Sequence, residues 1–129
     1  MRAITVTVVA FVLAGVLAAQ QPTFKRTVLQ QADISVPGHE VISALAEFEP
    51  RANPGRHTHF GEEIGYSLEG TFLLEQDGKP PVTLKAGGTF LIPAGTIHNA
   101  TNTGAGTGKI LATYIVEKGK PLATPAPAK

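Results

Sequence analysis

Three of the four histidines in this chain of 129 residues, together with one glutamate, fall inside two short segments whose spacing suits a metal site. The first segment, HTHFGEE at residues 57–63, holds His57, His59 and Glu63. The second, GGTFLIPAGTIHNATN at residues 87–102, holds His98. Imidazole nitrogens with one carboxylate oxygen are ligands that suit Zn, Cu, Fe, Mn or Ni. The residues therefore predict a bound divalent transition metal that keeps room for water or a substrate.

The two segments must reach one point from separate strands. His57 and His59 are two residues apart, and alternate residues of a strand point to the same side, so both rings can face one interior. Glu63 follows across a bend at Gly61. His98 begins a strand after the tight turn at residues 93–95. Ligands on separate strands are held at a fixed spacing by the backbone, which raises metal affinity without ordering a flexible loop.

The sequence predicts that β-strands position these residues. Short apolar runs alternate with turns rich in Gly, Pro, Asn and Asp, and no long segment after residue 19 has an apolar period of 3.6 residues. Many short strands at close spacing predict an all-β sandwich or barrel. The expected strands are residues 26–30, 40–48, 63–68, 71–76, 82–84, 89–92, 98–102 and 110–116.

The two segments resemble the signature motifs of the cupin family. The first family motif, G-x5-H-x-H-x3,4-E-x6-G, is matched from position 57 to position 70. The second, G-x5-P-x-G-x2-H-x3-N, is matched in full from position 87 to position 102. One position departs from the pattern, because the leading glycine of the first motif is replaced by Arg51.

The resemblance implies a single-domain, all-β jelly-roll barrel over residues 20–120, with the metal held by His57, His59, Glu63 and His98. It also implies that Asn102 holds backbone and that the glycines at positions 70, 87 and 95 form turns. Metal-free cupins exist, so an empty barrel lined by these side chains remains an alternative.

The first 19 residues predict a secretory signal peptide. Arg2 precedes an apolar run at residues 4–17, and small residues follow, so cleavage is expected near Ala18 or Ala19. The run is short for a membrane span, and cleavage would leave no stable membrane anchor. A retained N-terminal anchor is the alternative. There is no twin-arginine pair, so we expect general secretion to a periplasmic or extracellular location, where Cu and Zn compete strongly for a His-rich site.

Composition excludes several classes of partner. The chain has no cysteine, so thiolate ligands, disulfides and a lipoprotein anchor are absent. Removing Arg2 from the 11 Lys and Arg leaves 10, which equals the 10 Asp and Glu. A net charge of zero without a basic tract gives no support for nucleic-acid binding.

The last twenty residues of the chain contain an apolar strand and a segment rich in Pro and Ala, and each leads to a prediction. Residues 121–129 are rich in Pro and Ala and predict an extended, mobile tail, with a partner-docking strand as the alternative. Residues 110–116, ILATYIV, are apolar on both faces, which predicts a homodimer unless the N-terminal strand of the same chain covers the second face.

Other side chains near the motifs have simpler interpretations. A solvated charge is favoured at Arg56 and a surface carboxylate at Glu62, while His39 is not expected to be a ligand. The aromatic residues are assigned to the core or an interface rather than to chemistry; they are Phe60, Tyr66, Phe72 and Phe90.

These observations together favour an exported metal-binding protein with a small-molecule ligand or substrate. Cupins with this pattern include dioxygenases, isomerases, decarboxylases and non-catalytic binders. The resemblance implies a metal-dependent, oxygenase-like enzyme, and the mostly apolar barrel interior that it also implies favours a small, largely apolar or aromatic substrate. The alternative is a non-catalytic periplasmic module that binds a metal or small ligand.

Overall fold

The computed structural model describes residues 19–129, which form ten β-strands and no helix. The predicted signal peptide therefore lies almost entirely outside the described residues. The strands are β1 (Phe24–Asp33), β2 (His39–Phe48), β3 (His57–Thr58), β4 (Gly61–Glu69), β5 (Thr71–Gln76), β6 (Val82–Lys85), β7 (Thr89–Ile92), β8 (His98–Asn102), β9 (Gly108–Glu117) and β10 (Thr124–Pro125). In the described part of the chain, nothing helical is long and apolar enough to cross a membrane.

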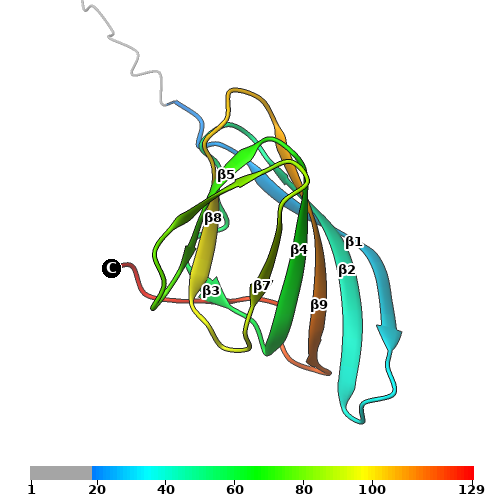
Figure 1. Ribbon diagram of the computed structural model, residues 1–129. Helices are drawn as coiled ribbons and strands as arrows, with labels where there is room; N and C mark the ends of the chain where they lie inside the picture. The colour runs from blue at the N-terminus through cyan, green and yellow to red at the C-terminus, as the bar shows by residue number, and fades with distance from the viewer. Residues whose placement is uncertain (1–18) are drawn as a thin grey trace, which may run out of the picture.

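The strands form two five-stranded antiparallel sheets that curve around a common interior (Figure 1). One sheet has the order β1-β2-β9-β4-β7, and the other has the order β10-β3-β8-β5-β6. Strands distant in the sequence lie side by side, as β2 and β4 do on either side of β9. This arrangement confirms the predicted all-β jelly-roll fold.

Alternation of side chains along each strand builds the core between the sheets. In β9 the even-numbered residues Ile110, Ala112, Tyr114 and Val116 are buried, while their odd-numbered neighbours are half-exposed. The same period of two places the even-numbered residues of β2 inside. The core therefore follows directly from the apolar alternation in the longest strands.

The predicted strand ends agree best with the structure where Gly, Pro, Asn or Asp lie near the ends of the strand. β5, β7 and β8 begin and end at the predicted residues. β1 is longer than expected because it pairs with β2 over almost its whole length, across a bulge near Val28. β3 and β10 were not predicted, since two residues are too few to show a period.

Asn102 ties the end of β2 and the β8–β9 connection together in the core. It is fully buried, and its Nδ2 donates to the carbonyl oxygens of Phe48 at 2.9 Å and Gly106 at 2.8 Å. Its Oδ1 accepts from the backbone N–H of Gly104 at 2.9 Å. The asparagine thus holds backbone, as the family resemblance implied.

The N-terminal strand does not cover the outer face of β9. β1 pairs with β2 at the edge of its sheet, which widens the sheet and leaves the outer face of β9 open (Figure 1). The apolar residues on that face are therefore not buried by the part of the chain that the structure describes.

Arg51, at the position of the leading glycine of the first motif, adopts a left-handed backbone conformation that favours glycine. Its φ is 71°, and it is the one residue other than glycine with positive φ among those described. Its backbone N–H donates to the carbonyl of Asn102 at 2.9 Å, which fixes the loop in this shape. The left-handed conformation brings Cβ close to the following carbonyl in any residue except glycine.

Replacing Arg51 with glycine is expected to raise the free energy of unfolding by up to about 1 kcal/mol, because glycine adopts this φ without the Cβ contact. The greater freedom of glycine in the unfolded chain offsets part of the gain. Thermal unfolding of residues 20–129 with metal removed would measure it as a Tm increase of about 4 °C or less. The control Arg51→Ala loses the same side chain but keeps Cβ, so its Tm should not rise. An equal increase in both variants would contradict an origin in backbone strain.

Candidate metal centre

The structure brings His57, His59, Glu63 and His98 together between the two sheets. His57 of β3 pairs with His98 of β8, and Glu63 lies in β4 of the facing sheet. All four residues are buried, with exposed fractions between 3% and 7%. The sequence predicted that His57 and His59 share one extended strand. In the structure β3 ends at Thr58, and His59 lies just beyond it. Their rings still face the same point, with centroids 4.8 Å apart.

The possible ligand atoms of these residues converge. Nε2 of His59 lies 3.0 Å from Oε2 of Glu63, and Nε2 of His98 lies 2.9 Å from the same oxygen. The four ligand atoms all lie within 4.8 Å of one another. Two ligands on opposite sides of an ion, each about 2.1 Å from it, would be about 4 Å apart. The spacing of the group is therefore close to that required by a bound metal ion, although the widest pair of atoms must approach by several tenths of an ångström.

Nδ1 of each of the three histidines is hydrogen-bonded to a backbone carbonyl oxygen. The acceptors and their distances from Nδ1 are Gly55 for His57 (2.7 Å), Thr96 for His98 (2.9 Å) and Leu122 for His59 (2.5 Å). A carbonyl oxygen can only accept, so each Nδ1 carries a proton and donates it. Each Nε2 is then free for a cation or a second proton, and one of the two must lie between Nε2 and the Glu63 oxygen that it faces, because a lone pair would repel that oxygen. This donor set fits a divalent transition ion.

Two of the groups have shifted pKa values. Burial lowers the pKa of His57 to about 4, which leaves its imidazole neutral at pH 7. Burial opposes the ionisation of Glu63, but hydrogen bonds donated to its carboxylate by His59 and His98 outweigh burial and lower the pKa of Glu63 to about 2. Metal ligands must be unprotonated imidazole and ionised carboxylate, so both groups are in the ligating form at neutral pH.

The sequence and its fold can now be compared with known proteins. The model of the cupin domain family matches residues 44–114, more than half of the chain. The chain belongs to the cupin family. The matched segment contains all four ligand residues, whereas β1 and the C-terminal segment lie outside it. Comparison with curated proteins gave no match.

Solved structures support the same fold. A cupin superfamily protein from Desulfitobacterium hafniense has a TM-score of 0.62 and 22% identity, over 81% of this chain and 88% of that one. A cupin domain from Bordetella pertussis has a TM-score of 0.60 and 22% identity, over 76% and 98%. An oxalate oxidase in complex with glycolate has a TM-score of 0.62 and 22% identity, over 78% of this chain and 54% of that one. At these identities the likeness concerns the jelly-roll fold alone.

This cupin has a small interior cavity at the ligand group. The cavity measures about 30 Å³ and contacts His57, Glu63 and His98. Two more polar side chains reach it, Arg26 from β1 and Tyr114 from β9. The interior is thus less purely apolar than the sequence predicted.

Tyr114 lies against the ligand group and stays protonated. Its ring centroid is 4.8 Å from that of His59, and the residue is 1% exposed. Burial raises the pKa of its hydroxyl, and the nearby carboxylate of Glu63 raises it further. The hydroxyl is therefore a hydrogen-bond donor rather than a base at neutral pH.

Sequence reasoning missed both Arg26 and Tyr114, because neither belongs to a motif. Tyr114 has the parity of Ile110 and Ala112, so the alternation of β9 could have placed it inside. Arg26 pairs with the inward-facing Ala46, a cross-strand register that the sequence does not reveal.

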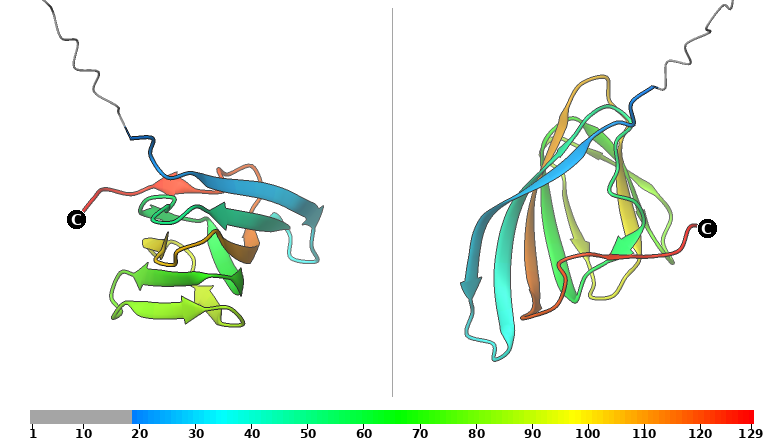
Figure 2. Two further views of the ribbon diagram at one scale, coloured as in Figure 1. Left: turned by 90° about the horizontal axis from the view of Figure 1, so that it is seen from above. Right: turned by 180° about the vertical axis from the view of Figure 1, so that it is seen from behind.

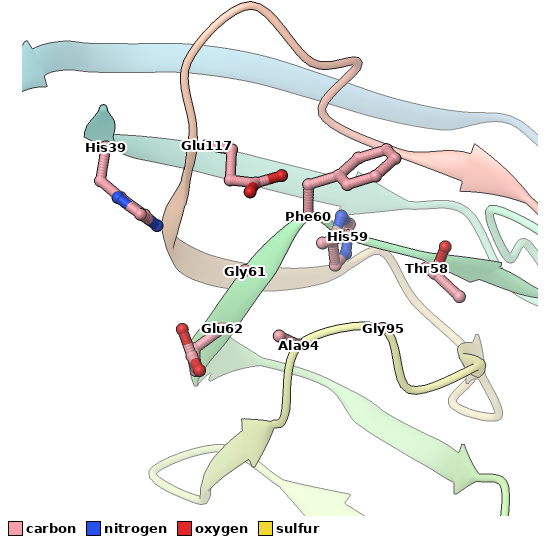
Figure 3. Close-up of a pocket in the computed structure, with 9 residues that line it drawn as sticks. All are labelled: His39, Thr58, His59, Phe60, Gly61, Glu62, Ala94, Gly95 and Glu117. Atoms are coloured by element: carbon pink, nitrogen blue, oxygen red, sulfur yellow. The ribbon is translucent and has the colours of Figure 1, made fainter. Parts of the chain in front are cut away.

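A larger depression of about 420 Å³ lies outside the barrel, where β4 begins and β9 ends (Figure 3). Of the ligand residues, only His59 contacts it. Glu62 and Glu117 make its rim acidic, and Glu62 faces outward as predicted. His39 also lies on this rim, outside the ligand group, in agreement with the sequence-based expectation.

The C-terminal segment packs on the barrel beside β3 (Figure 2). β10 pairs with β3, and the backbone N–H of Ala126 donates to the carbonyl of Arg56 at 2.9 Å. The sequence predicts an extended, mobile tail or a partner-docking strand; the structure has an extended segment that contacts its own chain. The physical reason is that β3 would otherwise be a sheet edge with unpaired backbone groups.

Arg56 is not the solvated charge that the sequence favours. Its Nη1 and Nη2 contact the two carboxylate oxygens of Asp77 at 3.0 Å and 2.8 Å, and its Nε donates to the carbonyl of Pro127 at 3.0 Å. The planar guanidinium matches the carboxylate in two places at once. Arg56 therefore fastens the C-terminal segment to the barrel.

Deletion of residues 122–129 is expected to lower the affinity for Zn about 10- to 100-fold, because His59 loses the carbonyl that orients its ring. Competition with a chelating dye would measure the affinity of folded protein. Deletion of residues 128–129 alone keeps Leu122, β10 and Pro127, and is expected to leave the affinity unchanged. Equal Zn affinity in the wild type and the longer deletion would contradict the contribution of Leu122.

Proposed function

We propose that this cupin is an exported metal-dependent enzyme of the oxygenase type, acting on a small molecule bound beside the metal. The observation that carries the proposal is the convergence of three imidazole Nε2 atoms and the Glu63 carboxylate next to an interior cavity. The four residues would hold Zn, Cu, Fe, Mn or Ni. A bound ion would supply Lewis acidity and, if redox-active, would activate dioxygen.

The protein's own residues prepare the reaction space. The carbonyls behind the imidazoles hold the rings in position before a metal binds, which removes the cost of ordering them later. Burial of the ligand group excludes bulk water and strengthens every electrostatic interaction inside it. Tyr114 offers a protonated hydroxyl to an oxygen atom of a bound molecule.

The size of the interior cavity limits what reaches the metal position. A volume of about 30 Å³ has room for about two water molecules. Dioxygen fits this space, whereas an aromatic ring, one of the substrate classes considered from the sequence, would stay at the barrel rim.

The alternative is a non-catalytic module that binds a metal or a small ligand. Among the described residues that line the interior cavity, no carboxylate or imidazole remains beyond the ligand residues to act as a general base. This observation favours binding over reactions that need proton abstraction by a side chain.

Metal content tests the proposal first. Protein purified from the periplasm without chelators or a His-rich tag is expected to contain nearly one ion per chain, measured by mass spectrometry. His98→Ala and Glu63→Gln are expected to lose most of it, because each removes one ligand. His39→Ala is the matched control, since His39 lies outside the ligand group, and should keep the full content.

Oxygen uptake then separates the enzyme from the binder. Wild-type protein loaded with Fe, Mn or Cu would be tested with thiols, catechols and short organic acids. Oxygen consumption that is lost in His98→Ala supports the oxygenase. Stoichiometric metal without turnover, but with thermal stabilisation by one of these molecules, would favour the binding module.

Export is part of the proposal and rests on the composition of residues 1–19. A chain secreted unfolded acquires its metal outside the cytoplasm, where Cu and Zn bind a His-rich site more tightly than Mn or Fe. The native ion is therefore proposed to be Zn or Cu, or one of the others where local supply favours it.

A homodimer is also proposed, and the outer face of the first sheet supports it. Ile64, Tyr66 and Leu68 of β4 and Leu91 of β7 are between 45% and 54% exposed, and Ile64 pairs directly with Leu91. Contiguous apolar side chains on an open sheet face are typical of an interface. A second copy would bury them by a two-fold axis.

Light scattering at micromolar concentration is expected to give the mass of a dimer. Ile64→Lys should shift the mass to that of a monomer, because it places a charge in the apolar face. Val36→Lys is the matched control: Val36 is similarly exposed, at 50%, but lies in the β1–β2 connection. A monomeric wild type would contradict the dimer.

A further inference from the structure

Arg26 is a positive charge at the interior cavity that no motif explains. It lies on β1, pairs with the buried Ala46 of β2, and lines the cavity together with His57, Glu63 and His98. Of the residues that line this cavity, it is the one with a permanent positive charge. The guanidinium therefore borders the same cavity as three of the four candidate ligand residues.

The guanidinium of Arg26 lacks an anionic partner in the described part of the chain. Its Nε is buried and has no hydrogen-bond acceptor among residues 19–129. Its central carbon lies 5.2 Å from the ring centre of Phe24 and 5.7 Å from that of Tyr114, so aromatic faces partly offset the charge. A buried donor without an acceptor is costly, and proteins keep such groups where a ligand completes them.

Glu63 forms no ion pair with Arg26 in the described part of the chain; its partners are His59 and His98. Glu63 is the one carboxylate at this cavity, and its Oε2 is already within 3.0 Å of His59 and His98. Arg56 shows the contrast, because its guanidinium is paired with both oxygens of Asp77. The donor of Arg26 is therefore available to an anion that enters the cavity.

We propose that the cavity receives the carboxylate group of a small organic acid, with Arg26 as the residue that holds this group. This inference rests on the proposed function, since the acid would lie beside the metal position. A planar carboxylate matches the planar guanidinium better than a tetrahedral anion does. The group that enters must be small because the cavity measures only about 30 Å³.

The interior cavity and the outer depression differ in the charge of the residues that line them. Glu62 and Glu117 line the depression and repel anions, whereas Arg26 attracts them to the interior. A metal ion held by three neutral imidazoles and one carboxylate would add a further positive charge there. The interior is thus where an organic acid binds.

Acetate and acetamide form a probe pair of similar size that differs in charge. Titration calorimetry on the Zn-loaded protein is expected to give at least 10-fold tighter binding for acetate, with inorganic phosphate weaker than acetate. Zn is redox-inert, so no turnover disturbs the measurement. Arg26→Gln should lower acetate affinity at least 10-fold and leave Zn content unchanged. Lys25→Gln is the matched control, because it removes an exposed charge from the next position of the same strand.

Chemical modification of the wild type gives a second measurement that does not depend on a folded variant. Phenylglyoxal, which reacts with arginine, should modify Arg26 more slowly in acetate than in acetamide, as read by peptide mass spectrometry. Arg56, paired with Asp77, is the internal reference and should show no difference. Because this measurement works with and without metal, it tests the acid site separately from the metal site.

Three outcomes would overturn the acid site: equal affinity for acetate and acetamide, unchanged acetate affinity in Arg26→Gln, or equal protection of Arg26 by both probes. Tighter binding of phosphate than of acetate would also overturn it, in favour of an oxyanion site. Failure to bind metal, with Arg26 still protected by acetate, would instead contradict the proposed function and leave the acid site standing.

Discussion

The organisation of this protein depends on burying three imidazoles so that their Nε2 atoms face one carboxylate. Such polar groups are costly in a core unless each is partnered. The partners behind the rings are backbone carbonyls from three separate places: the loop before β3, the turn between β7 and β8, and the C-terminal segment. The barrel must therefore hold loops and tail in position as firmly as it holds its strands.

The two outer strands, β1 and β10, give the site its particular character. Both lie outside the segment that matches the cupin family, and each occupies the edge of a sheet. From β1 comes Arg26, and just before β10 lies Leu122, whose carbonyl orients His59. The family segment thus contributes the ligand residues, while the flanking strands determine the charge and closure of the space around them.

Strand alternation and turn residues predicted most of the fold. The bounds of β5, β7 and β8 followed from short apolar runs between turns, and the buried face of β9 follows from a period of two. β3 and β10 could not be predicted, because two residues carry no period and their pairing depends on sixty or more intervening residues closing the barrel. The backbone of Arg51 could not be predicted either. The sequence shows only that an arginine replaces the motif's glycine, whereas the structure shows that the residue still has a positive φ.

The sequence by itself determined which four residues gather and what chemistry their side chains allow, because residue type and spacing within a strand act locally. It placed His57, His59, Glu63 and His98 in one interior, and the structure brings them there. Only the tertiary structure decided what surrounds them: the carbonyl behind His59, the guanidinium of Arg26, whose Nε finds no acceptor among residues 19–129, and the size of the cavity. These features arise where distant strands meet, and the register between such strands is set by packing of the whole barrel rather than by any local pattern.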